Sequence, residues 1–106
     1  MKGSERDALR ARSSAVFGNR YLAEVVTAVV ALAPQEGDQV TVRMVATRTG
    51  LADSLVRPVV KRLVEADLLR PQQQQRPRSA SYHEIHHLGG VWEALVKMCA
   101  LLRSQR

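Results

Sequence analysis

The sequence has few aromatic residues, a single cysteine and no long apolar run. Aromatic residues make up 4% of the chain, so leucine, valine and alanine must fill the core of a folded domain. Cys99 has no partner for an internal disulfide, and nothing points to an oxidising compartment. No apolar stretch approaches the ~20 residues that cross a bilayer, and residues 1–7 lack the apolar core of a signal peptide. These absences predict a small cytoplasmic domain that has no membrane segment.

The sequence also lacks the residue sets of common enzymes and metal sites. It contains no nucleophile–base–acid set and no glycine-rich phosphate loop, which argues against an enzyme. His83, His86 and His87 lie close together, but no cysteine or carboxylate accompanies them at a recognisable ligand spacing. We therefore expect no metal and no cofactor, and Cys99 is expected in the core. A histidine metal cluster and a redox-active Cys99 are the less favoured alternatives.

The composition is that of one globular domain with an uneven distribution of charge. Apolar residues make up 45% and charged residues 25% of 106 positions, which is enough chain for one buried core. The net charge is +6, but residues 1–40 are neutral and residues 79–106 carry +1, which leaves +5 on residues 41–78. A localised basic stretch is typical of proteins that bind a polyphosphate, although a merely solvated basic surface has the same pattern.

Turn residues and the spacing of apolar residues predict a mostly helical chain. The apolar residues of 21–33 follow the 3.6-residue period of a core helix, which ends before Pro34. Thr41 is expected to cap a short helix, and Gly50 to end it in a left-handed conformation. The predicted helices are 4–16, 21–33, 41–49, 53–66 and 91–103, and the predicted strands are 67–70 and 81–85, with a very short strand at Val40.

Three residues have the types and spacing that two steeply crossing helices require. Ala46 is small where the second helix would cross the first, Gly50 tolerates a positive φ in the turn, and Val56 points back at the first helix. This spacing is the helix-turn-helix signature, and two strands joined by a basic loop follow it. Residues 19–86 therefore resemble the winged helix-turn-helix family, and come closest to small bacterial repressors of the MarR and ArsR type.

The resemblance implies an α+β, mostly helical fold that binds double-stranded DNA. The helix at 53–66 would enter the major groove, and a two-stranded wing at 71–79 would lie on the backbone or the minor groove. Ser54, Arg57 and Lys61 share one face of that helix, since they are spaced i, i+3 and i+7. The predicted DNA-binding residues are polar or basic: Thr41, Arg43, Ser54, Arg57, Lys61, Arg62, Arg76 and Arg78.

The sequence departs from the family pattern at two positions. Pro58 lies about one turn inside the helix at 53–66, which is expected to begin as a tighter turn or to kink there. Asp67 stands where such domains often have glycine, and aspartate tolerates a left-handed conformation. We also expect Asp53 to cap the helix and Pro71 to stop the strand that follows.

The helices outside the central region predict a homodimer. Residues 1–18 and 87–106 are the expected dimerisation segments, because the last helix has a wider apolar stripe than one edge of a small core needs. A helix packed back on its own domain is the alternative. The predicted interface is apolar throughout: Leu9, Leu88, Val91, Trp92, Leu95, Met98, Cys99 and Leu102.

These patterns together predict a homodimeric, sequence-specific DNA-binding regulator, most simply a bacterial repressor in the nucleoid. Two alternatives stay open. A nucleoid or partition protein would bind DNA without regulating a gene. A winged helix used as a protein-interaction module would not need basic residues on both the second helix and the loop. The sequence identifies no effector.

Overall fold

The computed structural model describes residues 3–72 and 81–105, and these form an α+β fold that is mostly helical. Predicted helices lie within one or two residues of those observed. The elements in chain order are α1 (Gly3–Phe17), α2 (Leu22–Leu32), β1 (Gln39–Val40), α3 (Val42–Thr49), α4 (Asp53–Glu65), β2 (Leu69–Pro71), β3 (His83–Ile85), the 3₁₀ turn η1 (Leu88–Gly90) and α5 (Val91–Ser104).

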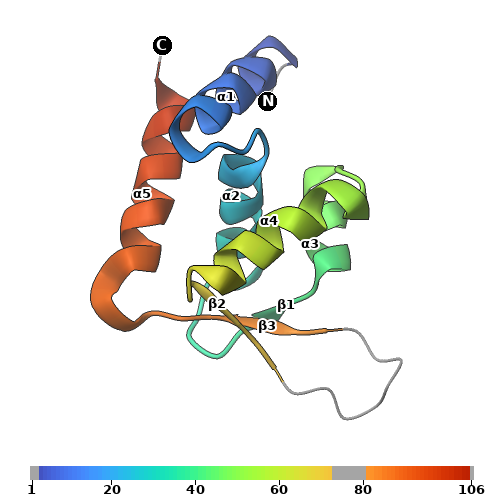
Figure 1. Ribbon diagram of the computed structural model, residues 1–106, viewed down its shortest axis with the longest axis vertical. Coiled ribbons are helices and arrows are strands. Elements are labelled where there is room, and N and C mark those ends of the chain that lie inside the picture. The colour runs from blue at the N-terminus through green and yellow to red at the C-terminus, as the bar shows by residue number, and fades with distance from the viewer. Residues whose placement is uncertain (1–2, 73–80, 106) are drawn as a thin grey trace.

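Helix α2 lies at the centre of the molecule (Figure 1), and α1, α3, α4 and α5 all contact it. Its Val25, Val26 and Val29 side chains have no solvent-exposed surface. A short helix rich in valine is stabilised mainly by such burial, because β-branched residues contribute little helix propensity. The prediction that this helix forms the core is confirmed.

The three strands form one antiparallel sheet in the order β1-β3-β2. We expected the second strand to end before Pro71. Instead, β2 includes Pro71 as its last residue, and Pro71 lies opposite His83 in β3. The backbone N–H of Gln72 donates to the Tyr82 carbonyl at 2.8 Å, so the pairing continues past the proline. In an antiparallel pair alternate residues face the partner, so the Pro71 nitrogen points away from β3 and no ladder hydrogen bond is lost.

The turn between α3 and α4 has the local structure that its residues predict. The Thr41 hydroxyl caps α3 by accepting a hydrogen bond from the Met44 N–H at 3.1 Å. Gly50 ends α3 with φ 76°, and its N–H donates to the Ala46 carbonyl at 2.8 Å. Ala46 and Val56 are both buried, so α3 and α4 pack together through a small and a β-branched side chain.

Helix α4 accommodates Pro58 without interruption. Its first turn is tightened, because the Ala52 carbonyl accepts from the N–H groups of both Leu55 (2.9 Å) and Val56 (3.2 Å). The expectation that Asp53 caps this helix is wrong by one residue, since Ala52 holds that position and Asp53 is the first helical residue. Asp67 has φ 60°, the left-handed conformation expected for this residue.

Helix α5 packs its predicted dimer stripe into the protein's own core. Trp92, Cys99 and Leu102 are 2%, 1% and 7% exposed, and Leu9 of α1 is also buried. As dimer contacts these four predictions are corrected, because α5 lies against α1 and α2 and its longest apolar stripe covers them. Leu95 is partly buried against the same core, Val91 and Met98 are exposed, and the Leu88 side chain lies outside the described residues.

No single helix in the described part of the chain is long and apolar enough to cross a membrane. Helices α1 and α2 reach that length and composition only together, and they meet at an angle of 102°.

Candidate nucleic-acid interface

Helix α4 has one apolar side and one polar side. Its buried residues repeat at the helical period and face the core: Val56, Val59, Val60 and Leu63. Ser54, Arg57 and Lys61 are all exposed. These three side chains therefore point outward, as predicted. Pro58 is exposed on the same surface.

Arg57 and Lys61 are free of intramolecular partners among the described residues, whereas six arginines in this part of the chain are engaged. The engaged arginines are Arg6 and Arg10 with Glu24, Arg12 with the Leu102 carbonyl, Arg43 with Asp53, Arg62 with the Phe17 carbonyl and Arg70 with Asp67. An unpaired exposed cation can bind an anion without first breaking an internal contact.

A groove of about 290 Å³ lies between α4 and the strands, and Arg57 and Lys61 line it. Val42 of α3, Pro71 of β2 and His83 of β3 complete much of its wall. The groove therefore combines cationic side chains with an apolar surface. The sequence does not predict that His83 lines this groove with Arg57 and Lys61, because that depends on how β3 packs beside α4.

Half-burial of His83 lowers the pKa of its imidazole below the usual 6.5. Desolvation disfavours the charged ring, and this effect outweighs the hydrogen bonds that favour it. At neutral pH His83 therefore contributes a neutral ring to the groove, and the positive charge there comes from Arg57 and Lys61.

A second hollow follows the turn between α3 and α4, and Arg43 lines it together with Ala46, Gly50 and Asp53. The Arg43 Nε and the Asp53 Oδ2 are 3.6 Å apart. An ion pair this exposed contributes little to stability, because water and salt screen it. Arg43 can therefore exchange Asp53 for an external anion.

Two predicted DNA-binding residues are used elsewhere. Thr41 is buried, and its hydroxyl serves the N-terminus of α3, so this prediction is corrected. The Arg62 guanidinium donates to the Phe17 carbonyl at 3.3 Å, which turns it toward the end of α1 and away from Arg57 and Lys61. Arg76 and Arg78 lie outside the described residues.

The three histidines do not converge on one point. The His86 Nδ1 lies 2.7 Å from the Asp67 carbonyl oxygen, and the His87 Nδ1 lies 2.7 Å from the Glu93 Oε1. The contact with His87 holds the pKa of Glu93 below its usual value. Across residues 3–72 and 81–105 no group of three or more histidine, cysteine or acidic side chains is arranged to hold a metal ion.

Cys99 is enclosed by the core, as its place in an apolar stripe predicted. Burial raises the pKa of its thiol to about 11, because the thiolate is disfavoured away from water. The thiol is therefore protonated at neutral pH, whereas a reactive cysteine needs an accessible thiolate.

Comparison of the chain with protein-family models, with curated proteins and with solved structures found no match.

Proposed function

We propose that this protein is a homodimeric, winged helix-turn-helix regulator that binds double-stranded DNA. In this proposal α3 and α4 are the helix-turn-helix, and β2, β3 and the segment between them are the wing. The observation that carries it is the outward side of α4, where Arg57 and Lys61 are exposed, unpartnered among the described residues and next to a groove. The charge of +5 on residues 41–78 supports the same conclusion.

The outward side of α4 suits the major groove of B-DNA. An exposed arginine such as Arg57 can donate two hydrogen bonds to guanine O6 and N7, and Lys61 can bind the same atoms or a phosphate. Ser54 lies in the first turn of α4 and can reach a phosphate or a base edge. The Pro58 ring is exposed on the same surface and offers apolar contact to a thymine methyl group.

The proposed dimer contact is the exposed part of the apolar surface of α5. Val91, Met98 and Leu101 are 58%, 44% and 55% exposed, and with the exposed Ala94 they are spaced 3, 4 and 3 residues apart. They extend the apolar band of α5 beyond the part that the core covers. A two-fold dimer would place two α4 helices about 34–36 Å apart, one turn of DNA, and would favour a palindromic site.

The first experiment is selection of bound sequences from random duplexes, followed by titration of the selected duplex and of a scrambled one. We expect Arg57→Ala to cost about 1–3 kcal/mol on the selected duplex and less on the scrambled one. Arg20→Ala is the matched control, because Arg20 is also exposed and has no partner in the described part of the chain but lies before α2. It removes the same charge from a different surface.

The outcomes separate this function from its alternatives. Selection without enrichment, with tight binding to every duplex, would indicate a nucleoid or partition protein. No binding to any duplex at low salt would favour a protein-interaction module. Affinity should fall steeply with salt, because bound phosphates release counterions. If Arg57→Ala and Arg20→Ala weaken both duplexes equally, α4 does not read bases.

A further inference from the structure

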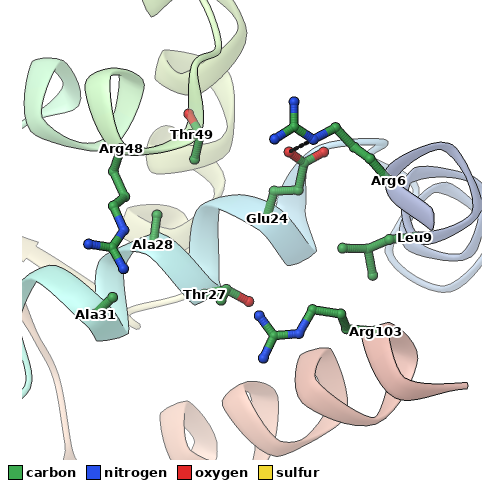
Figure 2. Close-up of a pocket in the computed structure, with 9 residues that line it drawn as sticks. All are labelled: Arg6, Leu9, Glu24, Thr27, Ala28, Ala31, Arg48, Thr49 and Arg103. Carbon is green, nitrogen blue, oxygen red and sulfur yellow. Dashed lines mark ion pairs between the residues drawn. The ribbon is translucent and has the colours of Figure 1, made fainter. Parts of the chain in front are cut away.

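A pocket of about 350 Å³ lies on the side of α2 where α1, α3 and α5 approach it (Figure 2). Arg6 comes from α1, Glu24 and Thr27 from α2, Arg48 from α3 and Arg103 from α5. None of the pocket residues comes from α4, and none lines the groove beside the strands. The pocket is therefore separate from the proposed DNA-binding surface.

Glu24, the acidic residue of this pocket, is already neutralised by two arginines. Arg10 binds it through two nitrogens, with Nε 2.5 Å from Oε1 and Nη2 3.3 Å from Oε2. Its hydrogen bond to Glu24 raises the pKa of Arg10 above the usual value. The Arg6 Nε lies 3.9 Å from the Glu24 Oε2, the contact that Figure 2 marks. Arg10 and Arg6 therefore compensate the negative charge of Glu24, which is not available to pair with Arg48 or Arg103.

Arg48 and Arg103 approach the pocket from two different helices without a carboxylate to pair with. Figure 2 shows Arg103 reaching from α5 toward Thr27 and Arg48 reaching across α2 from the opposite side. Neither guanidinium makes an ion pair or hydrogen bond with any residue of 3–72 and 81–105. Because both guanidinium groups line the same pocket, an anion bound there would be attracted by both.

The other polar groups of the pocket cannot act as donors. The Thr27 hydroxyl donates to the Ala23 carbonyl at 2.8 Å, and the Thr49 hydroxyl donates to the Val45 carbonyl at 2.9 Å. Leu9 and Ala28 supply an apolar floor. The available donors are therefore the guanidinium groups, and next to them lies an apolar surface.

We propose that this pocket binds a small organic anion, with a carboxylate or phosphate group between Arg48 and Arg103 and an apolar body on Leu9 and Ala28. Guanidinium groups bind both anions through paired hydrogen bonds. A volume of about 350 Å³ is at the lower end of the range of ligand sites, which limits the ligand to a small molecule. The site requires no DNA and no second subunit, so its test is independent of the proposed function.

The test is calorimetric titration of the full chain with phenylacetate and with phenyl phosphate. We expect both to bind and 2-phenylethanol, which has the same apolar body without the charge, to bind at least tenfold more weakly. Inorganic phosphate, which lacks the apolar body, should also bind more weakly than phenyl phosphate. These two comparisons test the cationic wall and the apolar floor separately.

Arg48→Gln and Arg103→Gln should each weaken binding of the anions at least about tenfold, since each removes charge-assisted hydrogen bonds. Arg20→Gln removes the same charge outside the pocket and should have no such effect. Arg48 and Arg103 are both exposed, so the variants should keep the wild-type circular dichroism spectrum and melting temperature.

Three results would overturn the proposal. The first is no binding of either anion at millimolar concentration. The second is equal binding of 2-phenylethanol and phenylacetate. The third is a loss of duplex binding in Arg48→Gln and Arg103→Gln without any change in anion binding, which would make the two arginines contacts to the DNA backbone.

Discussion

The connection between α1 and α2 depends on one buried hydroxyl group. Ser13 has no exposed surface, and its Oγ donates to the Asn19 carbonyl at 2.7 Å and accepts from the Ala23 N–H at 3.1 Å. One side chain thereby satisfies two backbone groups at the bend between α1 and α2. An unsatisfied buried polar group costs more than a hydrogen bond gains, so this serine matters more to stability than its size indicates.

We therefore predict that Ser13→Ala lowers the free energy of unfolding by about 2 kcal/mol or more, because it leaves two buried backbone groups without partners. Urea denaturation followed by circular dichroism measures the change. Ser14→Ala is the matched control, since that side chain is exposed, and it should change stability by less than about 0.5 kcal/mol. Equal effects of the two substitutions would contradict the role given to Ser13.

Burial of His83 predicts that the free energy of unfolding decreases as the pH falls below 6.5. Its pKa in the folded protein lies below 6.5, so at mildly acidic pH the unfolded chain binds more protons than the folded one. We predict that the contribution of His83 is constant well above pH 6.5 and becomes destabilising as the pH falls through 6.5 toward the folded-state pKa. His83→Gln should flatten this part of a plot of urea midpoint against pH. The same slope in wild type and variant would rule out His83 as its cause.

At the scale of elements, apolar periodicity located the helices well because each helix buries one side. The turn residues were equally informative, since Thr41 and Gly50 act through their own backbone and need no distant contact. Contacts between residues far apart in the sequence could not be predicted in this way. The sequence did not reveal that Arg62 turns to the Phe17 carbonyl, because that contact depends on where α1 ends relative to α4.

The same limit explains the wrong assignment of the α5 stripe. The most regular apolar spacing in that helix, through Trp92 and Cys99, predicts a surface for a partner, yet it faces the core. Periodicity identifies an apolar side of a helix but not what covers it. The position of α5 beside α1 and α2 (Figure 1) decides the question, and leaves Val91, Met98 and Leu101 exposed.

Pro58 weakens α4 because it removes the N–H that would donate to the Ser54 carbonyl. We predict that Pro58→Ala raises the free energy of unfolding by about 1–3 kcal/mol, since proline costs up to about 3 kcal/mol relative to alanine in a helix interior. The more restricted unfolded chain of the proline protein offsets part of this gain. Thermal and urea unfolding measure the effect. An unchanged or lower stability would show that the tightened first turn of α4 already compensates for the proline.

At the scale of the whole molecule, two hollows are lined by cations without partners among the described residues, and the hollows differ in shape. Arg57 and Lys61 lie along one helix beside an open groove, an arrangement that suits an extended polyanion. Arg48 and Arg103 come from α3 and α5 and line a single pocket, which suits a compact anion. The net charge of +6 does not show this difference, because internal contacts of arginines such as Arg10 and Arg62 decide which charges are available.

The proposed dimer can be tested by changing the exposed α5 residues alone. We predict that Met98→Glu combined with Leu101→Glu converts the protein to a monomer at micromolar concentration, because it places two carboxylates from each subunit in an apolar contact. Sedimentation equilibrium measures the mass. Both side chains are 44% or more exposed, so the double variant should keep its melting profile apart from the stability that dimer formation itself provides.

Ala100→Glu tests whether charge on α5 is sufficient to disturb the dimer. Ala100 is exposed on the same helix but lies on the side away from Val91 and Met98, so this variant should remain dimeric. The double variant should also lose most of its preference for a palindrome over a single half-site, since that preference requires two α4 helices held at a fixed spacing. A wild-type protein that is monomeric at micromolar concentration would contradict the dimer itself. Dimerisation of the double variant would place the interface elsewhere, with the exposed residues of α1 as the next surface to test.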